Sequence, residues 1–423
     1  MNRNTVIFAL MAMACVPAAM AQRDNRMHEN GVVSVVNNDT VSADHVEKTL
    51  KTVAPESPKE NGLPRFAIVG RDRGFYFGIG AQLLGEAMYD FGADAGSNTA
   101  FTPSAFTPAT PGYGSGIGFA WQSSSFYLNF VALPGTENQV GLFVKAKFNG
   151  TNNALRLYHI YAKYRGLTVG YTKSLFVDAA AEPMTIDDQG PNGYPSVRLF
   201  TAYWTQNFNK RWSGAIGIDA PATSLTTSDY TSAVKARTPS IPLYVQYAWN
   251  DKSHIRLSGL LRPMQYRDLR HERNHGLFGW GVQVSGMGHV AGPVSVQLNA
   301  VYGRGIGSYI QDDEGVGLDA VATGSTGDMK LVKTLGLTGG VHCAITKKLS
   351  SNIVYSHVTN WLPDEADVTP DKYKAGDYVA ANLIYSINKF VSTGVEYLYG
   401  LRKADDGSHI HANRIQAQIA VTF

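Results

Sequence analysis

The sequence predicts an all-β protein, a sixteen-stranded antiparallel transmembrane β-barrel with short periplasmic turns and long outer loops. Three observations lead to this prediction. An export signal opens the chain, apolar and polar residues alternate in many segments, and short connections alternate with long ones. Glycine (43 residues) and tyrosine (22 residues) are abundant and the mean hydropathy is slightly polar, as expected when half of each strand faces a water-filled lumen.

The first 21 residues have the pattern of a secretory signal peptide. Arg3 provides a basic start, an apolar run extends from Val6 to Val16, and Ala19-Met20-Ala21 forms a small-residue cleavage site. The run is shorter than the ~20 apolar residues that a membrane-anchoring helix needs. Cys15 does not indicate a lipoprotein, because Ala12 stands where the lipid-attachment motif usually has leucine. We therefore expect cleavage after Ala21 and localisation in the outer membrane.

Several functional classes find no support in the sequence. Cleavage would remove Cys15 and leave Cys343 alone, so no intramolecular disulfide is expected. The formal net charge is only +3, and no basic domain predicts nucleic-acid binding. The histidines within 270–275 and 409–411 match no metal-ligand spacing, and the sequence contains no P-loop, G-x-S-x-G or H-E-x-x-H motif. We expect no cofactor and no metal.

Residues 22–65 form a separate polar region that contains several prolines. Val46, Leu50 and Val53 lie at positions i, i+4 and i+7, which predicts a short helix from about Ala43 to Thr52. Such a helix is too short to be stable alone. We expect a periplasmic N-terminal segment, which is either a flexible linker or a helix that associates between subunits.

The transmembrane barrel is expected over residues 66–423. Sixteen strand candidates follow Gly74, and most match the ~9–11 residues that a tilted strand needs to cross a membrane. Their approximate ranges are 74–90, 123–132, 139–149, 154–164, 167–174, 196–207, 212–220, 241–249, 254–266, 276–288, 293–304, 331–345, 349–361, 375–387, 390–402 and 412–423.

The connections between these candidates alternate in length. Every other connection is a turn of a few residues, such as Arg165-Gly166 or Asn388-Lys389, whereas the intervening set includes long loops. The long loops cover 91–122, 175–195, 221–240, 305–330 and 362–374. An up-and-down barrel with short periplasmic turns requires this arrangement, and a sandwich with crossing connections does not.

The last strand shows the alternation most clearly. One face carries Ile415, Ala417, Ile419, Val421 and Phe423. The other face carries Arg414, Gln416, Gln418, Ala420 and Thr422 and is mostly polar. A closed barrel has no edge, so this strand is expected to pair with the first one and to need no tail after it. Phe423 would then lie at the periplasmic interface.

The cations predicted to face the lumen are the best candidates for solute contacts. Lys145, Lys147, Arg256 and Arg262 lie opposite the apolar residues of their strands and should therefore point inward. A narrow channel lined by cations lowers the electrostatic barrier for anions, and arginine binds carboxylates through two parallel hydrogen bonds. Arg198 is a further candidate, although it shares the parity of Phe200 and Trp204, which leaves its direction open. The alternative is that all five cations simply line a water-filled wall and bind no particular solute.

A set of motifs surrounds the third long connection, and two more lie near residues 64 and 303. The motif positions are His159, Tyr161, Gly170, Thr172, Ser174, Phe176, Asp178, Pro183, Thr185-Ile186-Asp187, Gly190-Pro191-Asn192 and Gly303–Ile310, together with PRFAIVGRDRGFYFGIG near residue 64. At these positions the sequence resembles the DcaP-like outer-membrane porins, in particular members from Bacteroides-type bacteria, and the resemblance covers about 65–423. Departures from the family pattern occur at Tyr158, Lys173 and Tyr203.

This resemblance implies a homotrimer in outer-membrane lipid that takes up small carboxylates, notably dicarboxylic acids. It also implies that the loop at about 175–195 folds inward as a constriction. Asp178, Asp187 and Asp188 would belong to that loop, where Asp187 and Asp188 either line the pore or hold the loop through turn hydrogen bonds. The terminal Phe423 resembles the signal that the barrel-assembly machinery recognises. Lys173 has the parity of the lipid side and is expected to reach the membrane interface.

The sequence therefore predicts an outer-membrane porin that passes small anionic solutes by passive diffusion. One alternative is a non-selective diffusion porin of the same fold. A second is a barrel enzyme such as a phospholipase or protease, which would place a serine–histidine or aspartate–histidine pair at the outer rim. His159 and His357 have no evident nucleophile beside them in the sequence, so the enzyme is the weakest of the three.

Overall fold

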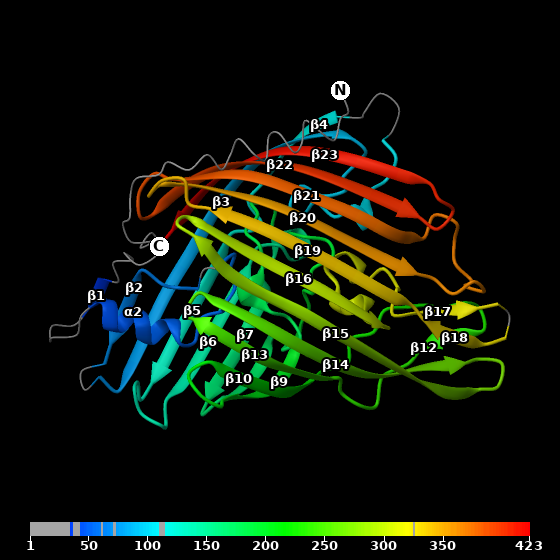
Figure 1. Cartoon of the computed structure of the whole chain (residues 1–423), viewed down its shortest axis with the longest axis horizontal. Coiled ribbons are helices and arrows are strands. Elements are labelled where there is room, and N and C mark those ends of the chain that lie inside the picture. Colours follow the sequence, from blue (N-terminus) through cyan, green and yellow to red (C-terminus); the bar gives the residue numbers. More distant parts are fainter. Residues whose placement is uncertain (1–33, 37–42, 61, 71–72, 110–114, 325) are drawn as a thin grey trace.

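The computed structural model is a closed barrel of sixteen antiparallel strands (Figure 1). The structure describes residues 34–36, 43–60, 62–70, 73–109, 115–324 and 326–423. The predicted signal peptide lies outside the described residues. Within them, no helix is long and apolar enough to cross a membrane.

The wall is an up-and-down meander in which each strand pairs with its neighbours in the chain. The first position is β3 (Phe75–Gly92), and β4 (Ser115–Ala120) and β5 (Ser125–Ala132) together form the second, because both pair with β3. The others are β6 (Val140–Lys147), β7 (Arg156–Tyr164), β8 (Leu167–Lys173), β9 (Arg198–Asn207), β10 (Trp212–Asp219), β13 (Ile241–Asn250), β14 (Ser253–Asp268), β15 (Arg273–Ala291), β16 (Val294–Arg304), β19 (Lys333–Cys343), β20 (Leu349–Trp361), β21 (Tyr373–Ser386), β22 (Val391–Ala404) and β23 (His409–Thr422).

The predicted strands and the alternation of short and long connections are confirmed, with one omission. Strand β4 lies inside the segment 91–122, which was predicted to be loop. In SGIGFA, glycines occupy the positions where an inward polar side chain would give the alternating signal. Ile117 and Phe119 nevertheless point outward and are 71% and 69% exposed. The bend at Trp121–Ser124 then separates β4 from β5.

The last strand closes the barrel on the first one. Strand β23 pairs with β3 in an antiparallel register in which Ile419 lies opposite Gly85. Phe423 and Ala81 exchange two backbone hydrogen bonds of 2.7 and 2.9 Å, so pairing continues to the final residue. Strand β3 thus satisfies the backbone groups of β23 that an edge strand would leave unpaired.

The part of β3 that extends beyond Phe423 carries a further strand. Strand β2 (Phe66–Val69) pairs with Tyr76–Ile79 of β3, and β1 (Ser34–Val36) pairs with β2 in parallel. The bounds of helix α2 (Ala43–Lys51) nearly match those of the helix predicted at 43–52.

At the long-loop end, β12 (Thr231–Ala233) extends the wall beside β14, and a small sheet combines β11 (Leu225–Thr226), β17 (Ala320–Thr323) and β18 (Asp328–Leu331). Short 3₁₀ turns complete the loops at Pro103–Ala105, Thr151–Asn153, Ala179–Ala181, Gly307–Tyr309 and Gln311–Asp313.

Several segments fold inside the wall and pack against its inner face. They include the inserted segment (residues 43–60 and 62–65), the β8–β9 loop (residues 174–197), the β16–β19 loop (residues 305–324 and 326–332) and the β3–β4 loop, whose Phe101 and Phe106 pack against Tyr378 and Leu398. The β8–β9 and β16–β19 loops pack on each other through an isolated bridge between Pro195 and Ile310, and their buried apolar side chains form a core with the wall residues Leu260 and Val301. The loop expected to form a constriction at 175–195 therefore packs on a second inward loop, the β16–β19 loop. The length of the loops alone did not predict this contact.

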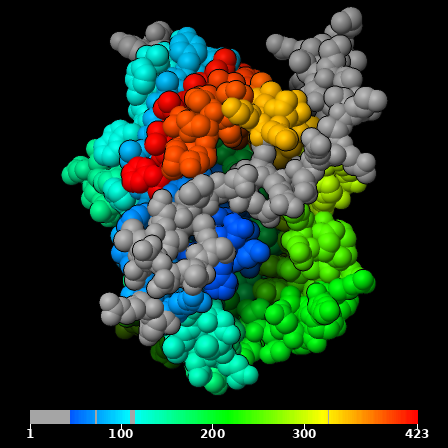
Figure 2. Space-filling model, turned by 90° about the vertical axis from the view of Figure 1, so that its left-hand side faces the viewer, coloured from blue at the N-terminus to red at the C-terminus, as the bar shows by residue number. Residues whose placement is uncertain are grey.

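The inserted segment enters from the short-turn end. Val46, Leu50 and Val53 pack against Tyr76 and Val131 on the inner face of the wall. In a view onto that end, the blue part of the chain that includes α2 lies within the ring of turns (Figure 2). The region expected to be a linker or an intersubunit helix is therefore, in its described part, in contact with the barrel lumen.

Candidate functional site

Lys145 and Lys147 lie on the inner face of β6, as their parity predicts. They alternate with outward residues such as Leu142, and only 1% of Lys145 is exposed. Lys147 donates to Asp188 of the β8–β9 loop at 2.5 Å and lies 4.2 Å above the ring of Tyr158. Lys145 makes no hydrogen bond or ion pair with any residue in the described part of the chain. Its ammonium is therefore a buried charge without a direct partner, which is costly unless an anion comes near it.

Arg198 and Lys173 also belong to this cation cluster. The structure places the Arg198 guanidinium 4.3 Å from the Tyr158 ring centre, so Tyr158 contacts two cations. The expectation that Lys173 points to lipid is wrong, because its ammonium bonds to Glu182 at 2.7 Å and is 7% exposed. Lys173 and Arg198 form the last pair of the β8–β9 ladder. The chain leaves the wall at that pair, so period-two alternation no longer determines the direction of either side chain.

Glu60, at the inner end of the inserted segment, is the acidic partner of this cluster. Its carboxylate bonds to Arg198, lies 2.8 Å from Nε2 of His159 and is 3.6 Å from Nζ of Lys173. Burial raises the pKa of the Glu60 carboxyl, but Lys173, Arg198 and His159 lower it more, so the pKa lies well below its usual value. Sequence reasoning missed Glu60, because a single glutamate in a polar region gives no periodic signal.

Glu182 connects the inserted segment to the β8–β9 loop. It accepts hydrogen bonds from Lys173 at 2.7 Å and from the Ser57 hydroxyl at 2.6 Å. Burial raises the pKa of the Glu182 carboxyl, but Lys173 and Lys59 together lower it by more, so the pKa lies below its usual value. Lys59 in turn donates to the Thr185 hydroxyl at 2.8 Å. The loop and the inserted segment therefore share one network of ion pairs.

The three aspartates of the β8–β9 loop differ in role. Asp178 accepts from His254 at 2.9 Å and Ser285 at 2.7 Å. Its pKa would rise by burial, but Arg256 and His254 bring it down to about 2. Asp187 accepts from the backbone N–H groups of Phe101 and Gly190 and from the Tyr378 hydroxyl. These bonds agree with loop pinning by Asp187, whereas Asp188 faces the cation cluster through Lys147.

Arg256 and Arg262 both point inward but have different surroundings. Arg256 lies 4.1 Å from the Tyr244 ring centre and 3.6 Å from Asp178. Arg262 is 1% exposed and forms two hydrogen bonds with Asp319, which belongs to the β16–β19 loop. Arg262 thus anchors a loop, and we do not assign it to the solute path.

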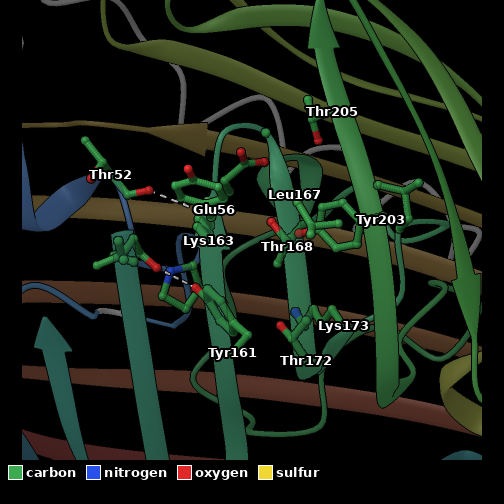
Figure 3. Close-up of a pocket in the computed structure, with 18 of the residues that line it drawn as sticks. Thr52, Glu56, Tyr161, Lys163, Leu167, Thr168, Thr172, Lys173, Tyr203 and Thr205 are labelled. Atoms are coloured by element: carbon green, nitrogen blue, oxygen red, sulfur yellow. Dashed lines mark hydrogen bonds between the residues drawn. The ribbon is translucent and has the colours of Figure 1, made fainter. Parts of the chain in front are cut away.

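A cavity of ≈ 490 Å³ leads from the short-turn end to this cluster. Its lining includes Glu56 and Glu60 from the inserted segment and His159, Lys173 and Arg256 from the wall and its ends. Figure 3 shows Thr52 and Glu56 on one side of the cavity and Thr168, Thr172 and Lys173 on the other. Of the cation cluster, Lys173 lines this cavity, and Glu60 in the lining connects the cavity to Arg198.

His159 is also part of a chain of hydrogen bonds that resembles a hydrolytic triad. Its Nδ1 lies 2.8 Å from the Thr172 hydroxyl, and its Nε2 lies 2.8 Å from Glu60. In serine hydrolases the carboxylate orients Nδ1 and the nucleophile faces Nε2, so the order here is reversed. Lys173 and Arg198 also share the Glu60 carboxylate. We interpret the group as part of the ion network.

The number of strands, the pairing of the last with the first and the inward β8–β9 loop define a porin-type barrel. No model of a protein family and no curated protein matches the sequence. Solved structures do match it in fold. The chain is similar to the outer membrane channel DcaP of Acinetobacter baumannii, with 19% identity and a TM-score of 0.71 over 84% of this chain and 99% of that one.

Two other solved porins have the same fold at lower similarity. The anion-selective porin from Comamonas acidovorans is 9% identical, with a TM-score of 0.52 over 82% of this chain and 100% of that chain. OmpF of Salmonella typhi, solved in complex with daunomycin, is 12% identical, with a TM-score of 0.50 over 83% and 98% of the two chains. At these identities the similarity shows the fold.

Proposed function

We propose that this protein is an outer-membrane channel through which small anionic solutes, in particular carboxylates and dicarboxylates, diffuse passively. The observation that carries the proposal is the cation cluster of Lys145, Lys147, Lys173 and Arg198, of which Lys173 lines the cavity. Lys145 has no direct anionic partner among the described residues, so the cluster can accept one more negative group. A carboxylate would meet donors there that satisfy both of its oxygens.

The outer surface of the wall supports placement in a membrane. Large apolar side chains are exposed along the strands, among them Ile216, Leu257 and Ile415 at 58%, 55% and 52% exposure. Exposed aromatic residues such as Trp212, Trp249 and Phe423 lie at the short-turn ends of their strands, as in the aromatic girdle at a membrane interface. We place the short turns in the periplasm and the long loops outside the cell.

Replacing Ile419 with Asp is expected to impair membrane assembly, because Ile419 is half exposed on the outer face of β23. A charge on the lipid face of a barrel costs ~2–4 kcal/mol near the midplane. The measurement is the yield of heat-modifiable protein in the outer membrane, with Ile419→Ala as the uncharged control. A normal yield from Ile419→Asp would contradict the assigned lipid face.

Membership in the DcaP-like group and assembly as a homotrimer are part of the same proposal. The matched positions around residues 159–192 and the fold similarity support the first, and the resemblance to this family implies the second. We further propose that the chain is exported by a signal peptide cleaved after Ala21.

Uptake of solutes into liposomes tests the proposed function. Vesicles that contain the purified protein should take up labelled succinate faster than an uncharged solute of the same size. Equal uptake of both solutes would favour the non-selective porin. Hydrolysis of phospholipid or peptide substrates by the same preparation would instead support the barrel enzyme.

A further inference from the structure

We propose that the inserted segment (residues 43–60 and 62–65) forms a built-in plug whose Glu60 carboxylate occupies the anion site of the channel, and that a solute carboxylate opens the channel by displacing Glu60. This inference rests on the proposed function, because it assigns a closed state to the same anion path. The plug would make solute entry depend on competition with a carboxylate that is tethered to the barrel itself.

The inner wall is shaped to receive the inserted segment. A Cβ atom on Gly141 of β6 would lie 2.1 Å from Cγ1 of Val53, and one on Gly78 of β3 would lie 3.0 Å from Cδ1 of Leu50. Any larger residue at these two wall positions would therefore collide with the segment. Gly62 fits between Pro55 and the Phe143 ring in the same way. The segment thus turns back inside the lumen and fills space that these glycines leave open.

Polar groups of the wall bind the backbone of the segment. The hydroxyl of Tyr161 donates to the Val53 carbonyl at 2.6 Å, Lys163 donates to the Thr52 carbonyl at 3.1 Å, and Tyr127 donates to the Leu63 carbonyl at 3.1 Å. Figure 3 shows Tyr161 and Lys163 directed toward the segment. These contacts use residues that would otherwise face water in an open lumen.

Glu60 satisfies the cluster in the way that a solute carboxylate would. One side chain supplies negative charge to Arg198, Lys173 and His159, which come from three different strands or strand ends. Without Glu60, Arg198 would keep no acidic partner within salt-bridge distance among the described residues. The acidic groups Glu182 and Asp188 would remain, each paired with one lysine, and Lys145 would stay unpaired. An empty site would therefore be strongly attractive to a small anion.

The contacts at the tip of the segment are ones that a solute can replace. Helix α2 has nine residues, so its stability depends on its packing against the wall. The tip around Glu60 depends on ion pairs, which another carboxylate can replace one for one. A solute with two carboxylates can satisfy Arg198 and the spare Lys145 together, whereas Glu60 supplies a single carboxylate.

Glu60→Gln is the principal test, with Asp44→Asn as the matched control. Both changes remove one carboxylate from the inserted segment, but Asp44 is exposed, lies outside the lining of the cavity and makes no hydrogen bond or ion pair with the described residues. In planar bilayers, Glu60→Gln should raise the open fraction of the channel at least ~10-fold, which corresponds to ~1.4 kcal/mol and is less than the usual effect of breaking a buried pair. Asp44→Asn should behave like the native protein.

A reversible crosslink provides a second test that does not alter charge. In Val53→Cys/Gly141→Cys, the two Cβ atoms would lie 3.4 Å apart, near the ~3.5–4.5 Å of disulfides. Combined with Glu60→Gln, the oxidised crosslink should return the open fraction to the native level, and reduction should release it again. An oxidised crosslink that leaves conduction unchanged would overturn the plug, because the segment would then not obstruct the path.

Succinate provides the third readout and separates this inference from the proposed function. Added succinate should raise the open fraction of the native channel and should have little effect on Glu60→Gln. An anion-selective channel in which Glu60→Gln, Asp44→Asn and the native protein open equally would overturn the plug and leave the anion channel intact. A channel that is open in Glu60→Gln but prefers cations would overturn the anion channel and the displacement by solute.

Discussion

Arg262→Leu is expected to lower the free energy of unfolding by ~3–5 kcal/mol. The change leaves the Asp319 carboxylate buried without its counter-charge, and breaking one partner of a buried pair is costly for that reason. Asp319 also accepts from the backbone N–H groups of Ser308 and Ser224, so it joins two loops that meet inside the barrel. Loss of Arg262 should therefore loosen the β16–β19 loop as well as destabilise the barrel.

Urea unfolding of the lipid-embedded protein measures this effect, and Arg304→Leu is the matched control. Arg304 is exposed at the end of β16, so its replacement should change stability by no more than ~0.5 kcal/mol. The double variant Arg262→Leu/Asp319→Asn should recover part of the loss, because it removes the unpaired carboxylate. A loss below ~1 kcal/mol in Arg262→Leu alone would contradict the anchoring role.

Lys145→Glu is expected to shift the channel from anion toward cation preference. A unit charge 4 Å from a passing ion contributes ~1 kcal/mol in bulk water and ~4 kcal/mol at an effective dielectric of 20. Because Lys145 has no direct partner among the described residues, its reversal changes the charge of the path without breaking an ion pair there. Lys147→Glu should give a similar shift but also detach Asp188 and so disturb the β8–β9 loop.

The reversal potential is the appropriate measurement for Lys145→Glu, because it reports the preferred ion and does not depend on how often the channel opens. Lys145→Gln should give an intermediate value. Lys252→Glu is a control for charge reversal in an exposed turn at the short-turn end, and it should stay close to native. If Lys145→Glu and Lys252→Glu gave the same reversal potential, Lys145 would not line the path.

The wall of the barrel could be predicted from the sequence because its physics is periodic. A strand with lipid on one side and a lumen on the other must alternate, and the connections of a meander must alternate in length. Strand β4 was not predicted because glycines occupy its inward positions and give no alternation of apolar and polar residues. The pairing of β23 with β3 followed from the requirement that a barrel have no edge.

The contents of the lumen could be predicted only in part. The alternation of strand residues predicted the inward direction of Lys145 and Arg262. It did not predict that Arg262 forms an ion pair with Asp319. The same rule failed for Lys173 because the wall ends at that residue. Glu60 is 99 positions from His159 in the chain, and no local pattern indicates that the two meet. Long-range packing of loops and the inserted segment decides these contacts, and a single sequence does not display it.

The reversal potential of the native protein in a salt gradient across a planar bilayer tests the central claim most directly. Measured together with Glu60→Gln, it reports the sign of the charge along the path in a channel with and without the tethered carboxylate. The cation cluster predicts a reversal potential on the anion-selective side for both proteins, with a larger conductance for Glu60→Gln. A reversal potential on the cation-selective side for both proteins would contradict the account of an anion channel.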